Sequence, residues 1–386
     1  MTAQPAMLAL YIHWPFCLSR CPYCDFNAHV REVIPQTRFR HALRRELAWE
    51  ANRLGRRRLT SVFFGGGTPS LMEPETVALL LDDARTLFDA SADIEITLEA
   101  NPTSVEMGRL SGFRDAGVNR ISMGIQSLEP DSLRMLGRRH TADQAIQALE
   151  IARRIFPRLS FDLIYARPEQ TETAWRAELR RALDLAADHL SLYQLTVEPG
   201  TNFEALHRRG ELVLPDDDRA AALYEATAEE AARFGLLSYE ISNYAKPGAE
   251  SRHNLAYWRY QDYAGVGPGA HGRISLDSQL RATRRHRAPE IWAERVERDG
   301  HGTVEETPVA RNDLSREMLL MGLRLAEGVE SGWFRARTGH ALVSALDPGT
   351  LLDAREAGYL VWRGTRLVAT QEGRRRLDAL LPRLLR

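Results

Sequence analysis

Three cysteines lie within a segment of eight residues, and their chemistry is the most specific signal in the sequence. Cys17, Cys21 and Cys24 are the three cysteines of this chain of 386 residues. An odd, tightly clustered set is a poor disulfide framework, whereas soft thiolates at spacings of four and three residues suit iron–sulfur clusters and zinc. Pro15 and Pro22 predict that the segment is a loop.

The two kinds of metal site make different demands on the rest of the sequence. Structural zinc would need a fourth ligand, for which His13 and His29 are the nearby candidates, and such sites usually combine two short knuckles. The sequence holds no second knuckle. A [4Fe–4S] cluster bound by three cysteines keeps one iron open for a cofactor or substrate. The spacing therefore favours iron–sulfur over zinc.

Composition and charge indicate an ordinary cytoplasmic protein. Hydrophobic residues make up 44% and charged residues 27% of the chain, and the net charge of −1 gives no sign of a nucleic-acid partner. No stretch approaches the ~18 apolar residues of a transmembrane segment. The first seven residues lack the basic and apolar regions of a secretory signal.

The elements that must position the cysteines alternate between short apolar strands and longer amphipathic helices. Predicted strands cover residues 8–13, 61–64, 94–99, 120–124, 160–164 and 189–196. Predicted helices cover residues 36–54, 73–88, 104–116, 141–155 and 171–187. This rhythm predicts an α/β protein with a partial (β/α)6 barrel of the TIM type, although the rhythm alone leaves a doubly wound sheet open. In both folds, ligands lie beyond the carboxyl ends of the strands.

The sequence after about residue 200 has a different character. We expect a helix from the acidic residues 216–218 to about residue 234, a strand at 236–241, and an irregular aromatic- and glycine-rich stretch at 253–272. Three helices, a hairpin turning near Arg363 and Gly364, and a terminal helix follow, which is the winged-helix order. The predicted units are a barrel (1–210), a barrel-closing extension (211–305) and a winged-helix-like α+β domain (306–386). A winged helix can bind DNA, but the neutral charge favours packing or partner docking.

The cysteine loop resembles that of the radical S-adenosylmethionine (SAM) superfamily, and the resemblance covers essentially the whole chain. Several segments are similar to the branch of oxygen-independent coproporphyrinogen III oxidases: residues 11–17, 24–26, 65–69, 99–102 and 162–165. The resemblance implies a [4Fe–4S] cluster on Cys17, Cys21 and Cys24. It also implies that SAM chelates the open iron and that the reduced cluster cleaves SAM to a 5′-deoxyadenosyl radical.

The same resemblance assigns further contacts. Positions that contact SAM at the cluster correspond to Tyr11, Gly66, Glu99, Gln126, Arg138 and Asp162. Positions at which the oxidases hold a second cofactor molecule correspond to Tyr23, Gly67 and Thr68. The residue types fit, because glycine exposes backbone N–H groups, carboxylates accept from hydroxyls or an ammonium, and arginine pairs with a carboxylate. Taken singly, a glycine turn or a helix-capping aspartate would explain such residues as well.

Within this branch, two functions compete. The oxidases carry a further cysteine where this chain has Phe26, and an N-terminal extension before the first strand. The HemW-type haem chaperones carry His-Asn-x-x-Tyr-Trp, which matches His253, Asn254, Tyr257 and Trp258. Imidazole is a natural haem ligand, so the resemblance makes His253 the candidate, ahead of His271. The alternative explanation of His253 is a hydrogen-bonded structural histidine.

The prediction is therefore a haem chaperone on a radical SAM scaffold, with anaerobic coproporphyrinogen oxidation as the alternative. Implied cofactors are the cluster, SAM and haem. Implied partners are haem and a haem-accepting protein, such as one associated with the respiratory chain, and a homodimer is compatible with this reading. One departure from the family is Ala166-Arg167 in place of Gly-Leu, whose added side chains would either narrow the ligand cup or alter what enters it.

Overall fold

A twelve-stranded sheet organises the larger part of the protein, which we describe from a computed structural model covering residues 7–385. Its six central strands are parallel neighbours: β1 (Met7–Trp14), β4 (Arg58–Gly66), β5 (Asp89–Ala100), β6 (Arg120–Gln126), β7 (Arg158–Tyr165) and β8 (His189–Gln194). All six were predicted from the sequence. Because their side chains are buried on both faces, they carry the nearly continuous apolar runs typical of parallel strands.

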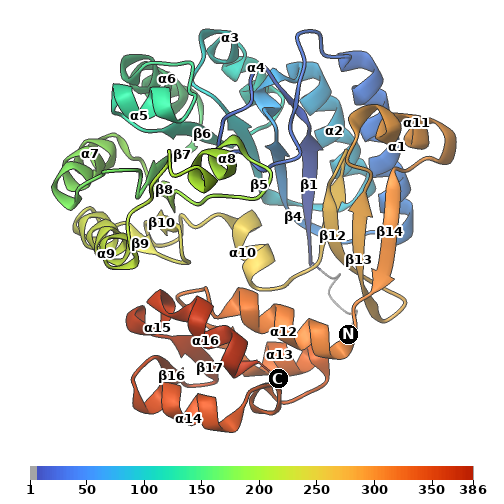
Figure 1. Cartoon of the computed structure of the whole chain (residues 1–386). Helices are drawn as coiled ribbons and strands as arrows, with labels where there is room; N and C mark the ends of the chain where they lie inside the picture. The colour runs from blue at the N-terminus through green and yellow to red at the C-terminus, as the bar shows by residue number, and fades with distance from the viewer. Residues whose placement is uncertain (1–6, 386) are drawn as a thin grey trace.

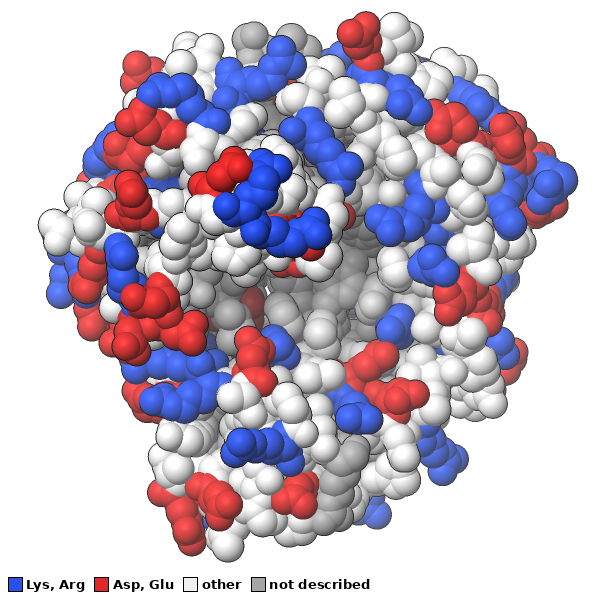
Figure 2. Space-filling model, viewed as in Figure 1, with Lys and Arg blue, Asp and Glu red and all other residues white. Residues whose placement is uncertain are grey.

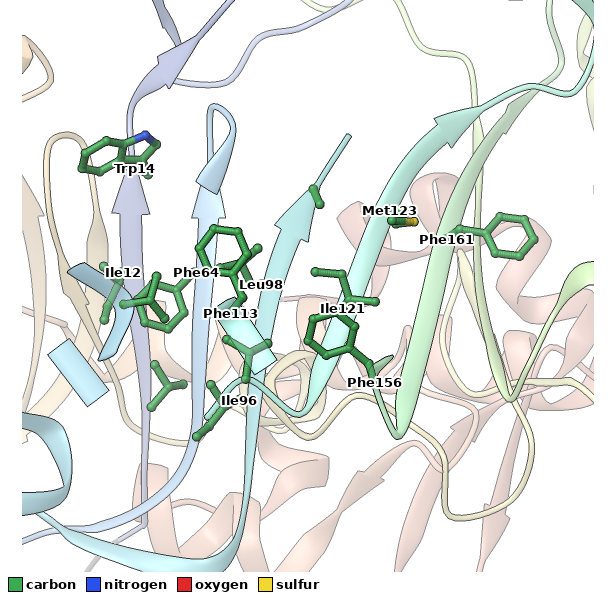
Figure 3. Packing of buried hydrophobic residues seen from close by; sticks show 14 of the residues in the cluster. Ile12, Trp14, Phe64, Ile96, Leu98, Phe113, Ile121, Met123, Phe156 and Phe161 are labelled. Atoms are coloured by element: carbon green, nitrogen blue, oxygen red, sulfur yellow. The ribbon is translucent and has the colours of Figure 1, made fainter. Parts of the chain in front are cut away.

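The helices that connect these strands cover the outside of the curved sheet (Figure 1). They are α1 (Gln36–Leu54), α2 (Pro74–Leu87), α3 (Ser104–Met107), α4 (Leu110–Asp115), α5 (Pro130–Met135), α6 (Ala142–Ile155) and α7 (Glu172–Leu185). The single helix expected at 104–116 is thus two short helices. Figure 3 shows apolar side chains of neighbouring strands, among them Ile12, Phe64 and Met123, in the core that these helices cover.

Both edges of the sheet are extended by strands that follow residue 200. Beside β8 lie β10 (Asn243–Ala245) and β9 (Leu237–Ser238). Beside β1 lies the parallel β11 (Tyr263–Val266), followed by the antiparallel β12 (His271–Leu276), β13 (Gln279–Arg285) and β14 (Thr303–Pro308). Within residues 7–385 the edge strands β14 and β9 do not pair with each other, so the barrel is open. The accompanying helices are α8 (Asn202–Arg208), α9 (Asp217–Arg233), α10 (Arg252–Trp258) and α11 (Pro289–Asp299).

The C-terminal residues form a second hydrophobic core with the helix and hairpin order of a winged helix. The elements are α12 (Arg311–Gly322), β15 (Val329–Glu330), α13 (Ser331–Thr338), α14 (Pro348–Glu356), β16 (Leu360–Arg363), β17 (Arg366–Ala369), α15 (Gln371–Arg375) and α16 (Leu377–Leu384). Arg337 pairs with Asp262 at 2.9 Å and Arg273 with Glu317 at 3.0 Å, which ties this unit to the segment around β11 and β12. The exact unit boundaries at residues 210 and 305 stay a prediction.

Candidate functional site

The cysteine loop leaves the barrel at the carboxyl end of β1 and is closed at its neck. Two short strands, β2 (Phe16–Cys17) and β3 (His29–Val30), pair in parallel at this neck. The His29 N–H donates to the Pro15 carbonyl at 2.7 Å, and the fully buried Phe16 anchors the strand in the core. Residues 17–29 therefore form a loop whose ends are held together while its side chains project over the barrel.

Two hydrogen-bond donors point at the cysteine sulfurs. The Thr68 hydroxyl donates to Cys17 Sγ at 3.3 Å, and Arg138 Nη1 donates to Cys21 Sγ at 3.4 Å. Burial raises the pKa of Cys17 to about 11 and also raises the pKa of Cys24. A bare thiolate is therefore unfavourable in this loop, and bound iron would supply the missing positive charge. Donors to sulfur are also a common feature of iron–sulfur sites.

The geometry of the loop suits a cluster better than a single zinc ion. Within residues 7–385, no three side chains of the metal-binding types are placed to hold one ion together. A cubane requires no such convergence, because each thiolate binds a different iron. His13 is unavailable as a ligand, since its Nε2 donates to the Asn27 carbonyl and its Nδ1 accepts from the Tyr11 hydroxyl, both at 3.0 Å. The three thiols fit a [4Fe–4S] cluster with one open iron.

A cavity of about 420 Å³ lies between the cysteine loop and the carboxyl ends of β4 to β7. We call it the first cavity. Eleven of the thirteen predicted site residues line it: Cys17, Cys21, Tyr23, Cys24, Gly66, Gly67, Thr68, Glu99, Gln126, Arg138 and Asp162. Tyr11 lines a neighbouring cavity, and His253 lines neither. The structure thus brings these eleven side chains together, while their roles as ligand contacts stay a prediction.

The glycine run at the end of β4 is required by close packing. Gly66 has φ of +117°, and a Cβ atom there would lie 2.6 Å from the His13 ring. A Cβ at Gly67 would lie 2.7 Å from the Phe16 carbonyl oxygen. Only glycine fits these positions, which lets the backbone at the strand end approach a ligand closely. The glycine run is therefore required by the packing around the strand end and does not serve only as a turn of the chain.

Two carboxylic acids lie buried in the floor of the first cavity. Burial, reinforced by the neighbouring Asp162, raises the pKa of Glu99 to about 8. Burial also raises the pKa of Asp162 to about 6. The Gly66 N–H donates to Glu99 Oε2 at 3.2 Å. A cationic ligand would lower both pKa values, so the pair is arranged to bind positive charge such as an ammonium or a sulfonium.

Buried polar atoms without partners also face this cavity. Gln126 has φ of +72°, and its Oε1 is buried without a hydrogen-bond partner, as is Arg138 Nε. Such atoms are costly unless a ligand satisfies them. Asn101, which was not among the predicted site residues, accepts from Arg138 Nη2 at 2.5 Å and donates to Thr68 Oγ1 at 3.3 Å. Asn101 therefore links Thr68 and Arg138, the two donors to the cysteine sulfurs. Its position in the strand-end segment 99–102 is the sequence signal that could have identified it as a site residue.

A second cavity, of about 600 Å³, adjoins the first. The two share Phe26, Gly66 and Glu99 in their linings. The remaining lining of the second cavity comes mainly from β1, α10 and the strands β11 to β13, and includes three tyrosines. Figure 2 shows that this side of the molecule is hollowed near its centre. A ligand in the second cavity would lie next to the groups that line the first.

His253 is enclosed between α10 and β4. Its Nδ1 is hydrogen-bonded to Ser61 Oγ and its Nε2 to the Tyr257 hydroxyl, both at 3.0 Å. Its ring stacks on Phe63, and burial lowers the pKa of His253 to about 3. Both ring nitrogens are therefore engaged in this state of the protein. A role as haem ligand stays a prediction, and it would require the hydrogen bond of Nε2 to Tyr257 and the surrounding packing to change.

The departure from the family at Ala166 and Arg167 does not narrow the first cavity. Arg167 is buried and forms an ion pair with Glu178 and a hydrogen bond with Ser127, so its side chain is held away from the lining. Ala166 takes a left-handed backbone conformation, with φ of +55°. Of the two consequences considered, the narrower cup is not observed in the first cavity, because a carboxylate on α7 draws the guanidinium into the packing around that helix.

An open parallel barrel with a three-cysteine loop at the carboxyl end of its first strand is the arrangement of a radical SAM protein. Two family models match the chain: the radical SAM superfamily at residues 11–182 and the HemN C-terminal domain at residues 309–376. The chain is 41% identical to "Radical S-adenosyl methionine domain-containing protein 1, mitochondrial" of Bos taurus, over 98% of this chain and 87% of that protein.

Two further comparisons concern bacterial proteins. The chain is 36% identical to "Heme chaperone HemW" of Escherichia coli, over 97% of both chains. Its fold matches the solved structure of E. coli coproporphyrinogen III oxidase (HemN) with a TM-score of 0.81 and 22% identity, over 98% of this chain and 90% of that one. The chain belongs to the HemW branch of the radical SAM superfamily. Membership implies a [4Fe–4S] cluster and SAM as cofactors.

The helices of the described residues are not of the membrane-spanning type. Among the helices of residues 7–385, none combines the length and the apolar character that crossing a bilayer requires. This agrees with the absence of a transmembrane segment expected from the sequence.

Proposed function

We propose that this protein takes up haem and transfers it to an acceptor protein, and that the cluster and SAM control uptake or release. The observation that carries the proposal is the second cavity, which opens beside the cofactor residues. Its volume of about 600 Å³ lies within the range of about 300–1,000 Å³ that is usual for ligand pockets. Its tyrosines, Tyr11, Tyr257 and Tyr263, offer faces for a flat aromatic ligand. The names of the bacterial relatives support haem as that ligand.

The residues of the first cavity have separate tasks in this proposal. Cys17, Cys21 and Cys24 would hold the cluster, which supplies an electron for SAM cleavage when reduced. Glu99 and Asp162 would bind the positive charge of SAM, and the backbone at Gly66 would leave room for it. Arg138 would hold the sulfur of Cys21 and offer its free Nε to an acceptor on the ligand.

The alternative is an anaerobic coproporphyrinogen III oxidase. The high structural similarity to the E. coli oxidase favours it, but that similarity concerns the fold, which both functions share. Phe26 stands where the oxidases carry their further cysteine, and it is 59% exposed at the border of the two cavities. An apolar face at this point suits the binding of a tetrapyrrole in either function.

The decisive experiment is an anaerobic turnover assay on protein reconstituted with iron and sulfide. Coproporphyrinogen III, SAM and a strong reductant are added, and the porphyrins are analysed by mass. The proposal predicts no decarboxylated product from a sample with a full cluster, together with binding of haem by the same sample. Multiple turnovers to a decarboxylated porphyrin would overturn the proposal in favour of the oxidase.

The finer features of the proposal concern partners and place. We infer a cytoplasmic location, although one group of relatives carries mitochondrial names. The acceptor would be a haem protein, for example one associated with the respiratory chain. A homodimer stabilised by cluster or haem belongs to the same proposal, and size-exclusion chromatography with light scattering of the loaded protein tests it.

A further inference from the structure

The wall of the second cavity that is formed by β12 and β13 carries a histidine and two arginines. His271 begins β12 and is paired across the antiparallel ladder with Arg284 of β13. Arg287 follows two residues after the end of β13 and lines the same cavity. The three side chains therefore line a cavity whose lining also includes Tyr11 and Tyr257.

His271 differs from the other histidines that line the two cavities. His13 is hydrogen-bonded through both ring nitrogens, and His140 is bonded to the Ile125 carbonyl at 3.0 Å. Within residues 7–385, the ring of His271 has no hydrogen-bond partner, and its side chain is exposed. Partial desolvation at the cavity wall and the nearby arginines lower the pKa of His271, so the imidazole is neutral at neutral pH and can bind a metal.

The two arginines differ in how their charge is balanced. Arg284 pairs at 2.8 Å with Glu305, its cross-strand neighbour on β14. Arg287 is exposed, and no carboxylate among the described residues pairs with its guanidinium. An arginine that lines a cavity and lacks an acidic partner is suited to bind a carboxylate of a ligand.

The floor and mouth of the cavity are aromatic. The rings of Tyr257 and Tyr263 meet edge to face with their centres 4.3 Å apart, and Tyr11 lies beside Phe63 and His253. Phe26 stands at the mouth. The cavity thus combines aromatic faces, one free imidazole and two guanidinium groups, which match the macrocycle, the iron and the propionates of haem respectively.

We propose that haem binds in the second cavity with His271 as an axial ligand of the iron and with its propionates directed to Arg284 and Arg287. This inference rests on the proposed function and names the site within it. His253 would then act as a structural residue that holds Tyr257 in the cavity wall through their hydrogen bond. Haem would lie across the border with the first cavity at Phe26, Gly66 and Glu99.

The test is a titration of ferric haem into the full-length, cluster-loaded protein, followed by optical and electron paramagnetic resonance spectroscopy. Four variants are compared with the wild type: His271→Ala, His253→Ala, Arg287→Ala, and His41→Ala as a control on the exposed face of α1. We expect His271→Ala to weaken haem binding by about tenfold or more and to change the haem spectrum, with added imidazole restoring the wild-type spectrum. Arg287→Ala should weaken binding without changing the axial-ligand signature.

Each result decides a separate question. Unchanged affinity and spectrum in His271→Ala, with haem bound to the wild type, would overturn the assignment of His271 but leave the chaperone proposal standing. Failure of the cluster-loaded wild type to bind haem would overturn the proposed function itself. A change of ligand signature in folded His253→Ala, but not in His271→Ala, would return the assignment to His253. Circular dichroism of each variant shows that it is folded.

Discussion

The two adjoining cavities of this protein differ in how firmly the side chains that line them are held by the rest of the structure. The first cavity is lined by side chains that the rest of the structure already holds: Thr68, Asn101 and Arg138 form a continuous hydrogen-bonded chain to the cysteine sulfurs. The second cavity includes exposed side chains in its lining, and within residues 7–385 the side chains of His271 and Arg287 have no hydrogen-bond or ion-pair partner.

This difference indicates two kinds of ligand. A preorganised set of donors costs little to engage and suits cofactors that must be held in one orientation. Free polar groups on the edge strands of an open sheet suit a ligand that enters and leaves. Under the proposed function, the same molecule would hold a cluster and SAM firmly while it exchanges haem, and the following variants separate the two properties.

The largest effect should come from removing a cluster ligand. Cys21→Ala should lose most of its iron and its visible cluster absorbance after reconstitution, because each thiolate holds its own iron. The second cavity contains no cysteine, so haem binding should persist. Iron analysis and haem titration check both points, with Ser19→Ala in the same loop as the control. Full iron content in Cys21→Ala would contradict the assignment of the ligands.

A smaller but still large effect is expected at the glycine run. Gly66→Ala places a Cβ atom 2.6 Å from the His13 ring at a positive φ, which should cost about 1–3 kcal/mol of folding free energy. SAM binding, measured by anaerobic calorimetry, should weaken by at least about tenfold. Gly349→Ala is the matched control, because its added Cβ would make only an ordinary contact. Equal SAM affinity in Gly66→Ala and Gly349→Ala would argue against SAM at this strand end.

The buried acids should make the stability of the ligand-free protein depend on pH. The pKa of Glu99 rises from 4.5 to about 8 on folding, so the folded chain keeps a proton that the unfolded chain releases. Stability should therefore fall as the pH rises from about 4.5 to about 8. Glu99→Gln should raise the unfolding free energy at pH 8 by about 2 kcal/mol and have little effect below pH 4.5. Denaturant unfolding at both pH values measures this, and exposed Glu150→Gln should show no such difference.

The smallest effect should come from the residue that connects the two cavities. Asn27 lies in the cysteine loop, three residues after Cys24, and its side-chain amide donates to the carbonyls of Pro268 and Arg287, both at 2.9 Å. Asn27→Ala should leave the cluster intact but loosen the wall that holds Arg287, which lowers haem affinity about three- to tenfold. Haem titration of the cluster-loaded variant measures the change. An unaltered affinity would show that the second cavity does not depend on this contact.

Much of the barrel could be predicted because its determinants are local. The strands β1 and β4 to β8 are apolar runs flanked by polar and turn-forming residues. The helix α6 begins with a capping box of Thr141 and Gln144, which can be recognised in the sequence. The cysteine spacing fixes three ligands in one loop. The gathering of strand-end residues follows from the parallel sheet itself.

The extension was harder to predict because its determinants are distant in sequence or weakly encoded. β12 and β13 join at Asp277 and Ser278, which both take positive φ without glycine, so the usual hairpin signal is absent. Arg285 is buried in an ion pair with Glu50 and lies near Glu46, partners more than 200 residues away. Such contacts determine where the second cavity forms, and no local sequence pattern predicts them.

The most direct test of the account is to measure whether SAM and haem bind at the same time. Cluster-loaded protein is equilibrated with isotope-labelled SAM in a dialysis cell, and haem is then titrated in while bound SAM is counted. Because the two cavities adjoin without coinciding, we expect SAM to remain bound at the same stoichiometry while haem saturates its own site. Displacement of SAM by haem in equal amounts would show one shared site and contradict the account.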